Sequence, residues 1–364
     1  MSLAPHSFDQ PALTDSPLRS NAGSPLAHAA VAAVLVLAMV GTLLPGAARA
    51  GILEAARQRG GVVCGVSEGI SGYSVRDAKG DWTGLAIDFC RALALAAIGK
   101  RDAVSFVALK PQERFSALQS GAIDVLASDA DLTSSRDAGH GIRFTEPLMY
   151  DGQGFLVRRA HGVTSALELS GSRVCVMADT GDEQGVIDYF AGLKLPIEIV
   201  KLEKWLDAVA AYDQRSCHVL SASLSRLAAV KARHAAPADQ IILPELAARH
   251  ATGAFVRQGD EQWFSIVRWT TFALFAAENL GVTSSNIEQM KASPAPEVRR
   301  FLAGGADLCT SLGLAPEWTQ RIIRQVGNYG ELYDRHFGLK AFRMDRGLNN
   351  LAGRGGLHFA PSFR

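Results

Sequence analysis

The stretch FTEPLMYDGQGFLVRR at residues 144–159 has a counterpart further along the chain, RHATGAFVRQGD at residues 249–260. The two share one frame, GFLVR at 154–158 and GAFVR at 253–257. Short runs of Phe, Val and Leu favour buried strands. A strand-like run that occurs twice, with a self-contained segment between the copies, predicts an inserted domain. The chain would enter this domain through one strand and leave it through the other.

Strand-like and helix-like segments alternate along most of the chain. Before the first copy we expect strands at 61–66, 104–108 and 123–127, and helices at 85–98 and 114–120. Between the copies we expect strands at 173–177, 197–202, 219–221 and 240–243, and helices at 183–191, 205–214 and 223–234. After the second copy we expect long helices at 261–279 and 316–330, and the Gly- and Arg-rich tail 339–364 has no clear period. This alternation predicts an α/β fold in which mostly parallel sheets carry helices on their faces.

The repeated strand divides the chain into two expected lobes. Lobe 1 comprises residues 51–154 and 253–364, and lobe 2 comprises residues 155–252. Two strands that lie side by side would form a paired hinge, and a cleft between such lobes is a favoured ligand site. Closure around a ligand is a known property of hinged domains. The alternative is two domains that only touch and do not move.

The first fifty residues differ from the rest and carry only four charged side chains. Residues 29–44 (AAVAAVLVLAMVGTLL) contain no charge. As a helix this run would be roughly 24 Å long, which is short of the ~30 Å hydrocarbon core of a bilayer. Ala48-Arg49-Ala50 has the small-x-small pattern of a signal-peptidase site. We therefore expect residues 1–50 to be a signal peptide cleaved before Gly51, with the mature protein in the periplasm. The alternative is an uncleaved membrane anchor.

The composition excludes several classes of function. The formal net charge is +1, with 48% apolar and 20% charged residues, so electrostatics give no reason to expect a nucleic-acid partner. The nine His residues are scattered, and no HExxH pattern occurs, so we expect no metal site. The chain has neither a P-loop nor a dinucleotide fingerprint, and we expect no cofactor.

Five cysteines follow the expected signal peptide. Their spacing matches no CxxC metal site, and export permits disulfides. We propose the pairs Cys64–Cys90 and Cys175–Cys217, one in each half of the molecule, which leaves Cys309 over. Four buried free thiols are the alternative.

Several segments together resemble one known family, the periplasmic general L-amino-acid-binding proteins of ABC transporters. They are GVVCGVSEGISGYSVRDAKGDWTGLAIDFCRALA, RFSALQSGAIDVL, FTEPLMYDGQGFLVRR, SALELSGSRVCV, RQGDEQWFSIVRWTTFAL, RIIRQVGNYGELYDRHFG and RGLNNL. The resemblance covers nearly all of residues 51–364. It implies the two-lobed periplasmic-binding-protein fold of type II, with a disulfide in each lobe. It also implies delivery of a captured solute to a membrane permease. We expect a monomer that is not an enzyme.

The resemblance carries over to the ligand site only in part. In the family, the loop after the third strand supplies hydroxyls and an Arg for the ligand's α-carboxylate, and Arg136 matches that Arg. A guanidinium suits a carboxylate because its two donors match two oxygens. However, Asp129 and Asp131 stand where the family has a run of Asn, Thr and Trp residues. Tyr73 fits the aromatic wall of the pocket.

The second lobe departs further from the family. Where the family has a Gly-Thr-Thr-Thr-Glu run at a helix start, a favourable place for an anion, this chain has Asp179, Thr180, Gly181 and Asp182. The family's Asp for the ligand's ammonium falls at Ser223. A neutral hydroxyl cannot give a buried ammonium a charge-assisted bond.

These departures leave several hypotheses about function open. The chain is expected to capture an amino acid or a related small polar compound. With four acids near the cleft, that compound would be cationic or would bind turned around. The alternative is that some of these acids face solvent. Two other functions use the same scaffold: a lyase- or dehydratase-like enzyme, with Glu183 as general acid, and a ligand sensor.

Overall fold

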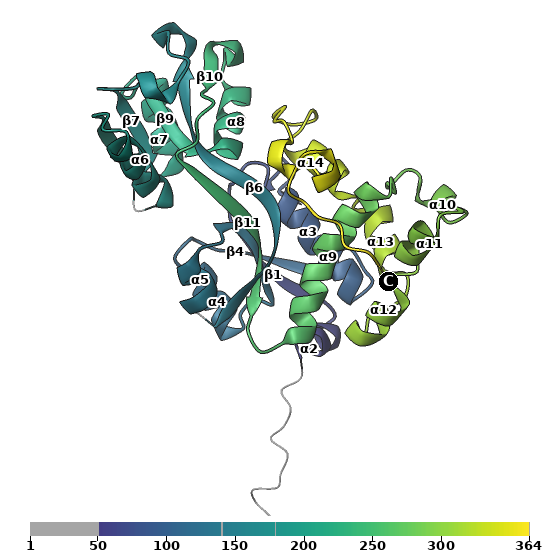
Figure 1. Cartoon of the computed structure of the whole chain (residues 1–364). Coiled ribbons are helices and arrows are strands. Elements are labelled where there is room, and N and C mark those ends of the chain that lie inside the picture. The colour runs from purple at the N-terminus through teal and green to yellow at the C-terminus, as the bar shows by residue number, and fades with distance from the viewer. Residues whose placement is uncertain (1–50, 140, 179, 364) are drawn as a thin grey trace, which may run out of the picture. The chain divides into compact units, whose positions relative to one another are not determined.

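The computed structural model describes residues 51–139, 141–178 and 180–363 (Figure 1). The expected signal peptide at 1–50 and the predicted site residue Asp179 lie outside this range. Within the described residues, no helix has the length and apolar character needed to cross a bilayer.

Strands and helices alternate up to β10, and the chain is helical after β11. The strands are β1 (Val62–Val66), β2 (Val75–Arg76), β3 (Trp82–Thr83), β4 (Val104–Ala108), β5 (Val125–Asp131), β6 (Ile142–Arg158), β7 (Arg173–Met177), β8 (Glu198–Leu202), β9 (Val219–Ser223), β10 (Gln240–Ile242) and β11 (Ala248–Arg257). The longer helices are α2 (Ile52–Arg59), α3 (Leu85–Ala97), α6 (Gly181–Gly192), α7 (Trp205–Asp213), α8 (Leu224–Arg233), α9 (Glu261–Asn279), α13 (Trp318–Gln325) and α14 (Tyr329–His336). The shorter helices are α4 (Arg114–Ser120), α5 (Ser134–Gly139), α10 (Ile287–Met290), α11 (Pro296–Leu302) and α12 (Ala306–Leu312).

The sheet confirms the predicted α/β class. Its strand order is β4-β1-β5-β11-β6-β9-β7-β8, with β10 added to β6. β1 pairs in parallel with β4 and β5, and β7 pairs in parallel with β8 and β9. The long antiparallel strands β6 and β11 run between these two parallel groups (Figure 1). We call the group with β1, β4 and β5 the first lobe and the group with β7, β8 and β9 the second lobe.

The five-residue copies at 154–158 and 253–257 do not pair with each other, although the strands β6 and β11 that contain them do. Residues 149–153 of β6 pair with residues 248–252 of β11. The first copy pairs with β9 and β10 in the second lobe, and the second copy pairs with β5 and with residues 142–147 of β6 in the first lobe. Because the two strands run in opposite directions, each copy begins the lobe that the chain is entering. The repeated sequence therefore forms the same strand in each lobe, and the residues just before each copy make the paired crossing.

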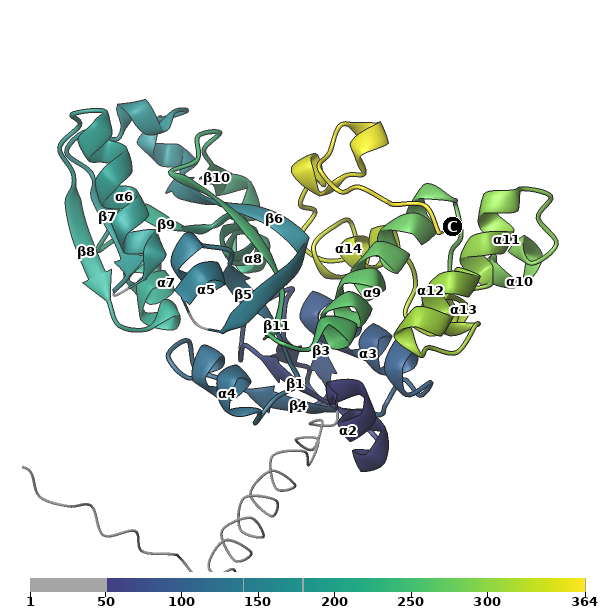
Figure 2. The ribbon, with the colours of Figure 1, turned by 60° about the horizontal axis from the view of Figure 1, so that its bottom comes forward.

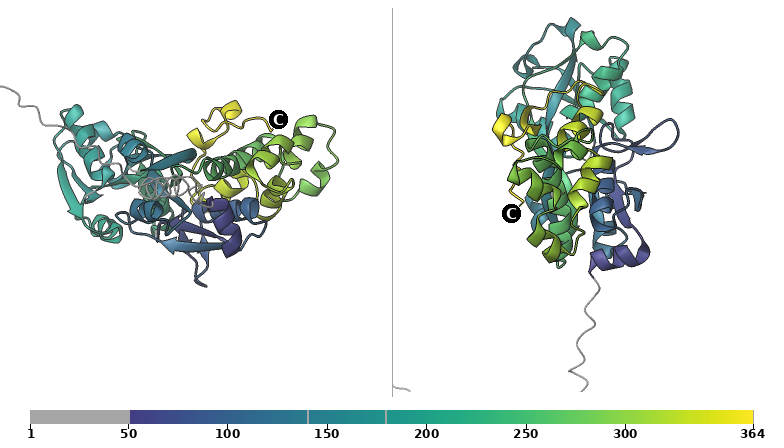
Figure 3. Two further views of the ribbon diagram at one scale, coloured as in Figure 1. Left: turned by 90° about the horizontal axis from the view of Figure 1, so that it is seen from below. Right: turned by 90° about the vertical axis from the view of Figure 1, so that its right-hand side faces the viewer.

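Each lobe has its own apolar core. In the second lobe, successive residues of β6 face opposite sides of the sheet, as strand geometry requires. Phe155 packs with Phe190 on one side, and Leu156 belongs with Tyr212 to the core on the other side. The main core of the first lobe lies between the sheet and the helices α3, α9, α13 and α14. Helices α10 to α13 lie on the far side of α9 from the second lobe (Figures 2 and 3).

Both predicted disulfides form. Cys64 of β1 is bonded to Cys90 of α3, with their Cα atoms 6.3 Å apart. Cys175 of β7 is bonded to Cys217, just before β9, with their Cα atoms 5.7 Å apart. Both separations lie within the usual range for disulfides. Cys309 is a buried free thiol whose Sγ lies 3.2 Å from the carbonyl oxygen of Gly304.

The prediction of one continuous helix at 316–330 is wrong, because two helices form there. α13 ends at Gln325 and α14 begins at Tyr329. Gly327 has a φ of 101°, which a helix cannot contain. The side chain of Asn328 accepts a hydrogen bond from the main-chain N–H of Glu331, and the Glu331 side chain accepts one in return from the N–H of Asn328. This capping box starts a new helix.

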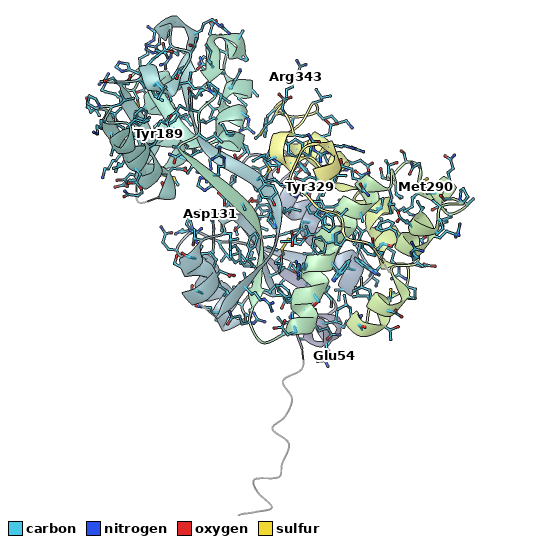
Figure 4. All side chains as sticks on the ribbon, in the orientation of Figure 1. Glu54, Asp131, Tyr189, Met290, Tyr329 and Arg343 are labelled. Carbon is cyan, nitrogen blue, oxygen red and sulfur yellow. A yellow bond between two sulfur atoms is a disulfide. The ribbon has the colours of Figure 1, made fainter. Side chains whose placement is uncertain are left out.

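The described part of the tail, residues 339–363, contacts the first lobe at α9 and the crossing strand β6. The guanidinium of Arg346 makes two bonds, of 2.8 and 3.0 Å, to the buried carboxylate of Glu278 in α9. The side-chain amide of Asn349 donates to the carbonyl of Tyr150 at 2.8 Å, and its oxygen accepts from the N–H of Tyr150 at 2.7 Å. Tyr150 belongs to the part of β6 that pairs with β11. The tail therefore holds one strand of the crossing in place; Figure 4 labels Arg343 in this segment.

A buried carboxylate joins α3 to α14, and we expect its loss to destabilise the fold. Asp88 accepts bonds from Arg91 at 3.1 Å and Arg335 at 2.5 Å, and its Oδ2 lies 2.8 Å from Nε2 of His336. Burial alone would raise the pKa of Asp88, but the hydrogen bond from His336 and the interactions with His336 and Arg335 lower it to about 2. A lowered pKa stabilises the fold at neutral pH, and this contribution is lost as the pH falls from about 4 towards 2.

Asp88→Asn should therefore lower the free energy of unfolding at pH 7 by about 2 kcal/mol, measured by urea denaturation. The difference from wild type should shrink as the pH approaches 2. Asp102→Asn is the matched control, because the Asp102 side chain is 84% exposed in its ion pair with Arg101 and such pairs contribute ~0.5 kcal/mol or less. Equal effects of the two substitutions would contradict the role given to Asp88.

Candidate functional site

A polar cavity of about 220 Å³ lies between the two lobes, beside the crossing strands. The carboxyl ends of β5, β7 and β9 reach it, together with the helix starts that follow β7 and β9. Ligands of open α/β sheets bind at such strand ends. The volume is below the roughly 300–1,000 Å³ that is typical of pockets for drug-sized ligands, so the cavity suits a small solute.

Every predicted site residue that the structure describes lines this cavity. They are Tyr73, Asp129, Asp131, Arg136, Thr180, Gly181, Asp182 and Ser223. The sequence had not indicated several further lining residues, among them Arg114, Asp151, Arg226, His250 and Thr252. The cavity therefore contains more positive charge than the sequence suggested.

Asp129 lies at the centre of a charge cluster that joins the lobes. Its Oδ1 is 3.0 Å from Arg114 at the start of α4, and its Oδ2 is 2.8 Å from Arg226 of α8 in the second lobe. The hydroxyl of Ser67 also donates to it at 2.5 Å. Burial alone would raise the pKa of Asp129, but the two guanidinium groups lower it to about 2. Asp129 is therefore an ionised carboxylate whose charge is already balanced by the protein.

Asp131 is also paired within the protein. Arg136 donates to its carboxylate and, at 2.8 Å, to its main-chain carbonyl, and Nδ1 of His250 lies 3.5 Å from Oδ2 (Asp131 is labelled in Figure 4). Although burial acts in the opposite direction, the hydrogen bond from His250 and the charge of Arg136 hold the pKa of Asp131 well below its usual value. The hydrogen bond to Asp131 in turn raises the pKa of His250.

These pairings remove Asp129 and Asp131 from the acids that were expected to attract a cationic ligand. Arginines pair with both Asp129 and Asp131, although the Asp131 side chain is still 30% exposed. Two of those arginines, Arg114 and Arg226, come from segments far from the acids in sequence. Among the described lining residues, four Asp side chains meet three Arg side chains and His250. The cavity is thus close to electrically balanced.

Two other carboxylates in the cavity form no ion pair with any residue that the structure describes. Asp151, on the crossing part of β6, is 7% exposed, and Asp182 lies in the first turn of α6. Burial raises the pKa of both groups. An unpaired buried carboxylate is unfavourable for the free protein, so a cationic group of a ligand would be stabilised beside it.

Neighbouring side chains are held by the protein itself. The hydroxyl of Tyr73 lies 3.3 Å from Oγ1 of Thr252 on β11, and its ring meets that of Phe337 edge-on at 5.3 Å. Thr180 donates its hydroxyl to the carbonyl of Met177 at 2.7 Å, and its side chain makes no capping hydrogen bond to α6. Tyr73 thus forms a fixed wall of the cavity.

Buried polar atoms without a partner gather at this cavity. Among residues 51–139, 141–178 and 180–363 they are Nε of Arg114, Oδ2 of Asp151, Oε1 of Gln153 and Nε2 of His250. Three of these four residues line the cavity, and Gln153 follows Asp151 on the same face of β6. Because buried polar groups normally have a partner, this concentration indicates that a polar ligand completes the site.

Comparison with known proteins agrees with the geometry. The family model of bacterial extracellular solute-binding proteins, family 3, matches residues 62–285. The chain is 42% identical to the general L-amino acid-binding periplasmic protein AapJ of Rhizobium johnstonii, over 87% of this chain and 94% of that protein. It is 36% identical to the glutamate/glutamine/aspartate/asparagine-binding protein BztA of Rhodobacter capsulatus, over 88% of this chain and 96% of that protein.

A solved structure is similar over the same range. It is an ABC transporter periplasmic binding protein from Brucella ovis with glutathione bound, at 40% identity and a TM-score of 0.81. It is matched over 87% of this chain and 100% of that chain. These three relatives are named as binding components and not as enzymes.

Proposed function

The chain belongs to the bacterial extracellular solute-binding proteins of family 3, and from this premise we propose that it captures an amino acid or a close derivative between its lobes. One observation carries the proposal above all. The cavity combines the arginines around Asp129 with the unpaired carboxylate of Asp151. A solute with both a carboxylate and an ammonium group would match this arrangement of opposite charges.

The names of the relatives support the same class of solute. AapJ is named for general L-amino acids, BztA for four particular amino acids, and the Brucella ovis protein holds glutathione. Free amino acids and glutathione all carry an α-ammonium group next to a carboxylate. This shared group is the feature that a small cavity with both signs of charge can recognise.

Capture would involve closure of lobes with the proposed boundaries 51–154 plus 253–364 and 155–252. Both lobes line the cavity, so a solute bound there touches both. A ligand shifts an open–closed equilibrium only through contacts that differ between the two states. Solute contacts with Asp151 and Tyr73 on one side and with α6 and α8 on the other would provide that difference.

The enzyme alternative has no support at its expected catalytic residue. Glu183, the suggested general acid, forms an ion pair with Lys201 at 2.5 Å. Glu183 is also not among the described residues that line the cavity. The proposed partner is the permease of an ABC transporter. The proposed location is the periplasm, reached after cleavage before Gly51, and we expect a monomer.

Thermal unfolding with a panel of solutes tests this function. L-Amino acids should raise the melting temperature, because a ligand at 100 times its Kd adds about 2.7 kcal/mol to the stability of the native state. Polyamines carry no carboxylate and dicarboxylates carry no ammonium, so both should have little effect. Stabilisation by polyamines alone would support a cationic solute and contradict the proposal.

A further inference from the structure

The position where the resemblance expects an acid for the solute's ammonium is neutral. Ser223 immediately precedes α8, and its Oγ lies 3.2 Å from Oγ of Ser225 in the first turn. Both hydroxyls therefore interact with each other. Nothing at position 223 offers a negative charge to the cavity.

Asp151 brings a carboxylate to the same helix start from a different element. It lies on the crossing part of β6, where Gln153 pairs with Ser223 of β9. Its Oδ1 accepts hydrogen bonds from the N–H of Gly152 at 2.8 Å and from the N–H of Ser225 at 3.4 Å. The carboxylate is thus fixed beside Ser223, with one oxygen occupied by the main chain.

The other oxygen of Asp151 is available to the cavity. The side chain is buried, the residue lines the cavity, and Oδ2 has no hydrogen-bond partner among the described residues. Two basic groups that act on Asp151 electrostatically form their ion pairs with other acids: Arg226 bonds to Asp129 at 2.8 Å, and Nδ1 of His250 lies 3.5 Å from Asp131. A buried carboxylate oxygen without a cation is poised to accept one.

We propose that the carboxylate of Asp151 binds the ammonium group of the solute and so replaces the acid missing at position 223. This inference rests on the proposed function, because it requires a solute with an ammonium group. It makes Asp151 a specificity-determining residue that selects amino acids over the corresponding acids without an ammonium group. The Asp151 carboxylate belongs to the crossing strand, and the N–H of Ser225 in the second lobe helps to orient it.

Calorimetric titration of Asp151→Asn tests the inference. The probes are L-glutamate, L-glutamine and L-arginine, each paired with its analogue without the ammonium group: glutarate, glutaramate and 5-guanidinopentanoate. Wild type should prefer each amino acid that it binds over its analogue by at least 50-fold. In Asp151→Asn this preference should fall below fivefold, because only the amino acid loses an ion pair. Asp188→Asn, an exposed change on α6, should retain the wild-type preference.

Moving the negative charge from position 151 to position 223 tests whether the effect of Asp151→Asn is only structural. The double variant Asp151→Asn with Ser223→Asp should recover at least tenfold of the lost preference, because it restores an acid beside the same helix start. Asp151→Asn itself should melt no lower than wild type without solute, since it removes a buried unpaired charge.

The outcomes separate the inference from the proposed function. If wild type binds amino acids and Asp151→Asn keeps the full preference, the inference is wrong and the function stands. The same conclusion follows if Asp182→Asn, and not Asp151→Asn, removes the preference. If wild type binds neither these three amino acids nor glutathione, the proposed function fails and the inference fails with it.

Discussion

Replacing Arg226 with Met is expected to weaken amino-acid binding by roughly 100-fold, or about 3 kcal/mol. Arg226 belongs to the second lobe and bonds to Asp129 in the first lobe at 2.8 Å, with its side chain only 12% exposed. Its loss removes a cation that a solute carboxylate would meet, and it also removes a contact between the lobes. Methionine keeps an unbranched chain for packing near Trp205, whose ring lies 5.5 Å from the guanidinium.

Calorimetry with the amino acid that stabilises the protein most would measure this effect. Arg233→Met is the matched control, because it makes the same change on the same helix at an exposed position. The control should bind within twofold of wild type. Arg114 and Ser67 still bond to Asp129 in the Arg226 variant, so its fold should persist. Affinity within threefold of wild type would show that Arg226 has no part in capture.

Replacing Gly84 with Ala should produce the largest loss of stability, about 4 kcal/mol. Gly84 precedes α3 with a φ of 135° and a ψ of 170°, a conformation that essentially only glycine adopts. An added Cβ would overlap the main-chain carbonyl of Tyr73. The first turn of α3 donates its N–H groups to the carbonyls of Gly72 and Tyr73, at 2.8 and 3.1 Å. The substitution would therefore disturb both α3 and the cavity wall.

Gly80→Ala is the control that separates the clash of an added Cβ from the cost of a positive φ. Gly80 also has a positive φ, of 85°, but an added Cβ would meet no atom within 4 Å. Its cost should be about 1 kcal/mol, measured by the same urea denaturation. Equal losses at the two glycines would mean that the close approach of Gly84 to Tyr73 contributes nothing.

Local patterns predicted most of the elements. The strand at 104–108, the helix at 114–120 and the helix at 261–279 begin and end where β4, α4 and α9 do. Each is a single periodic run with clear ends, so nearby residues determine it. The helix expected at 316–330 failed because apolar periodicity continues through Gly327 and Asn328, while a positive φ and a capping box end one helix and start another.

The charges of the site could not be predicted in the same way. Arg226 and Asp129 are 97 positions apart, and only the closure of the sheet across β6 and β11 brings them together. The sequence therefore showed acids without their partners and suggested a negative cleft. Asp151 stood in the stretch that predicted the fold, but nothing local distinguishes it from a solvent-exposed loop Asp. Its importance follows from burial and from a missing partner, which only the folded chain reveals.

A crystal structure of the protein with a stabilising amino acid tests the central claim most directly. We expect the solute in the cavity between the lobes, with its ammonium nitrogen ~3 Å from the Asp151 carboxylate and its carboxylate facing arginine side chains. A solute bound outside this cavity, or held by one lobe alone, would contradict the account.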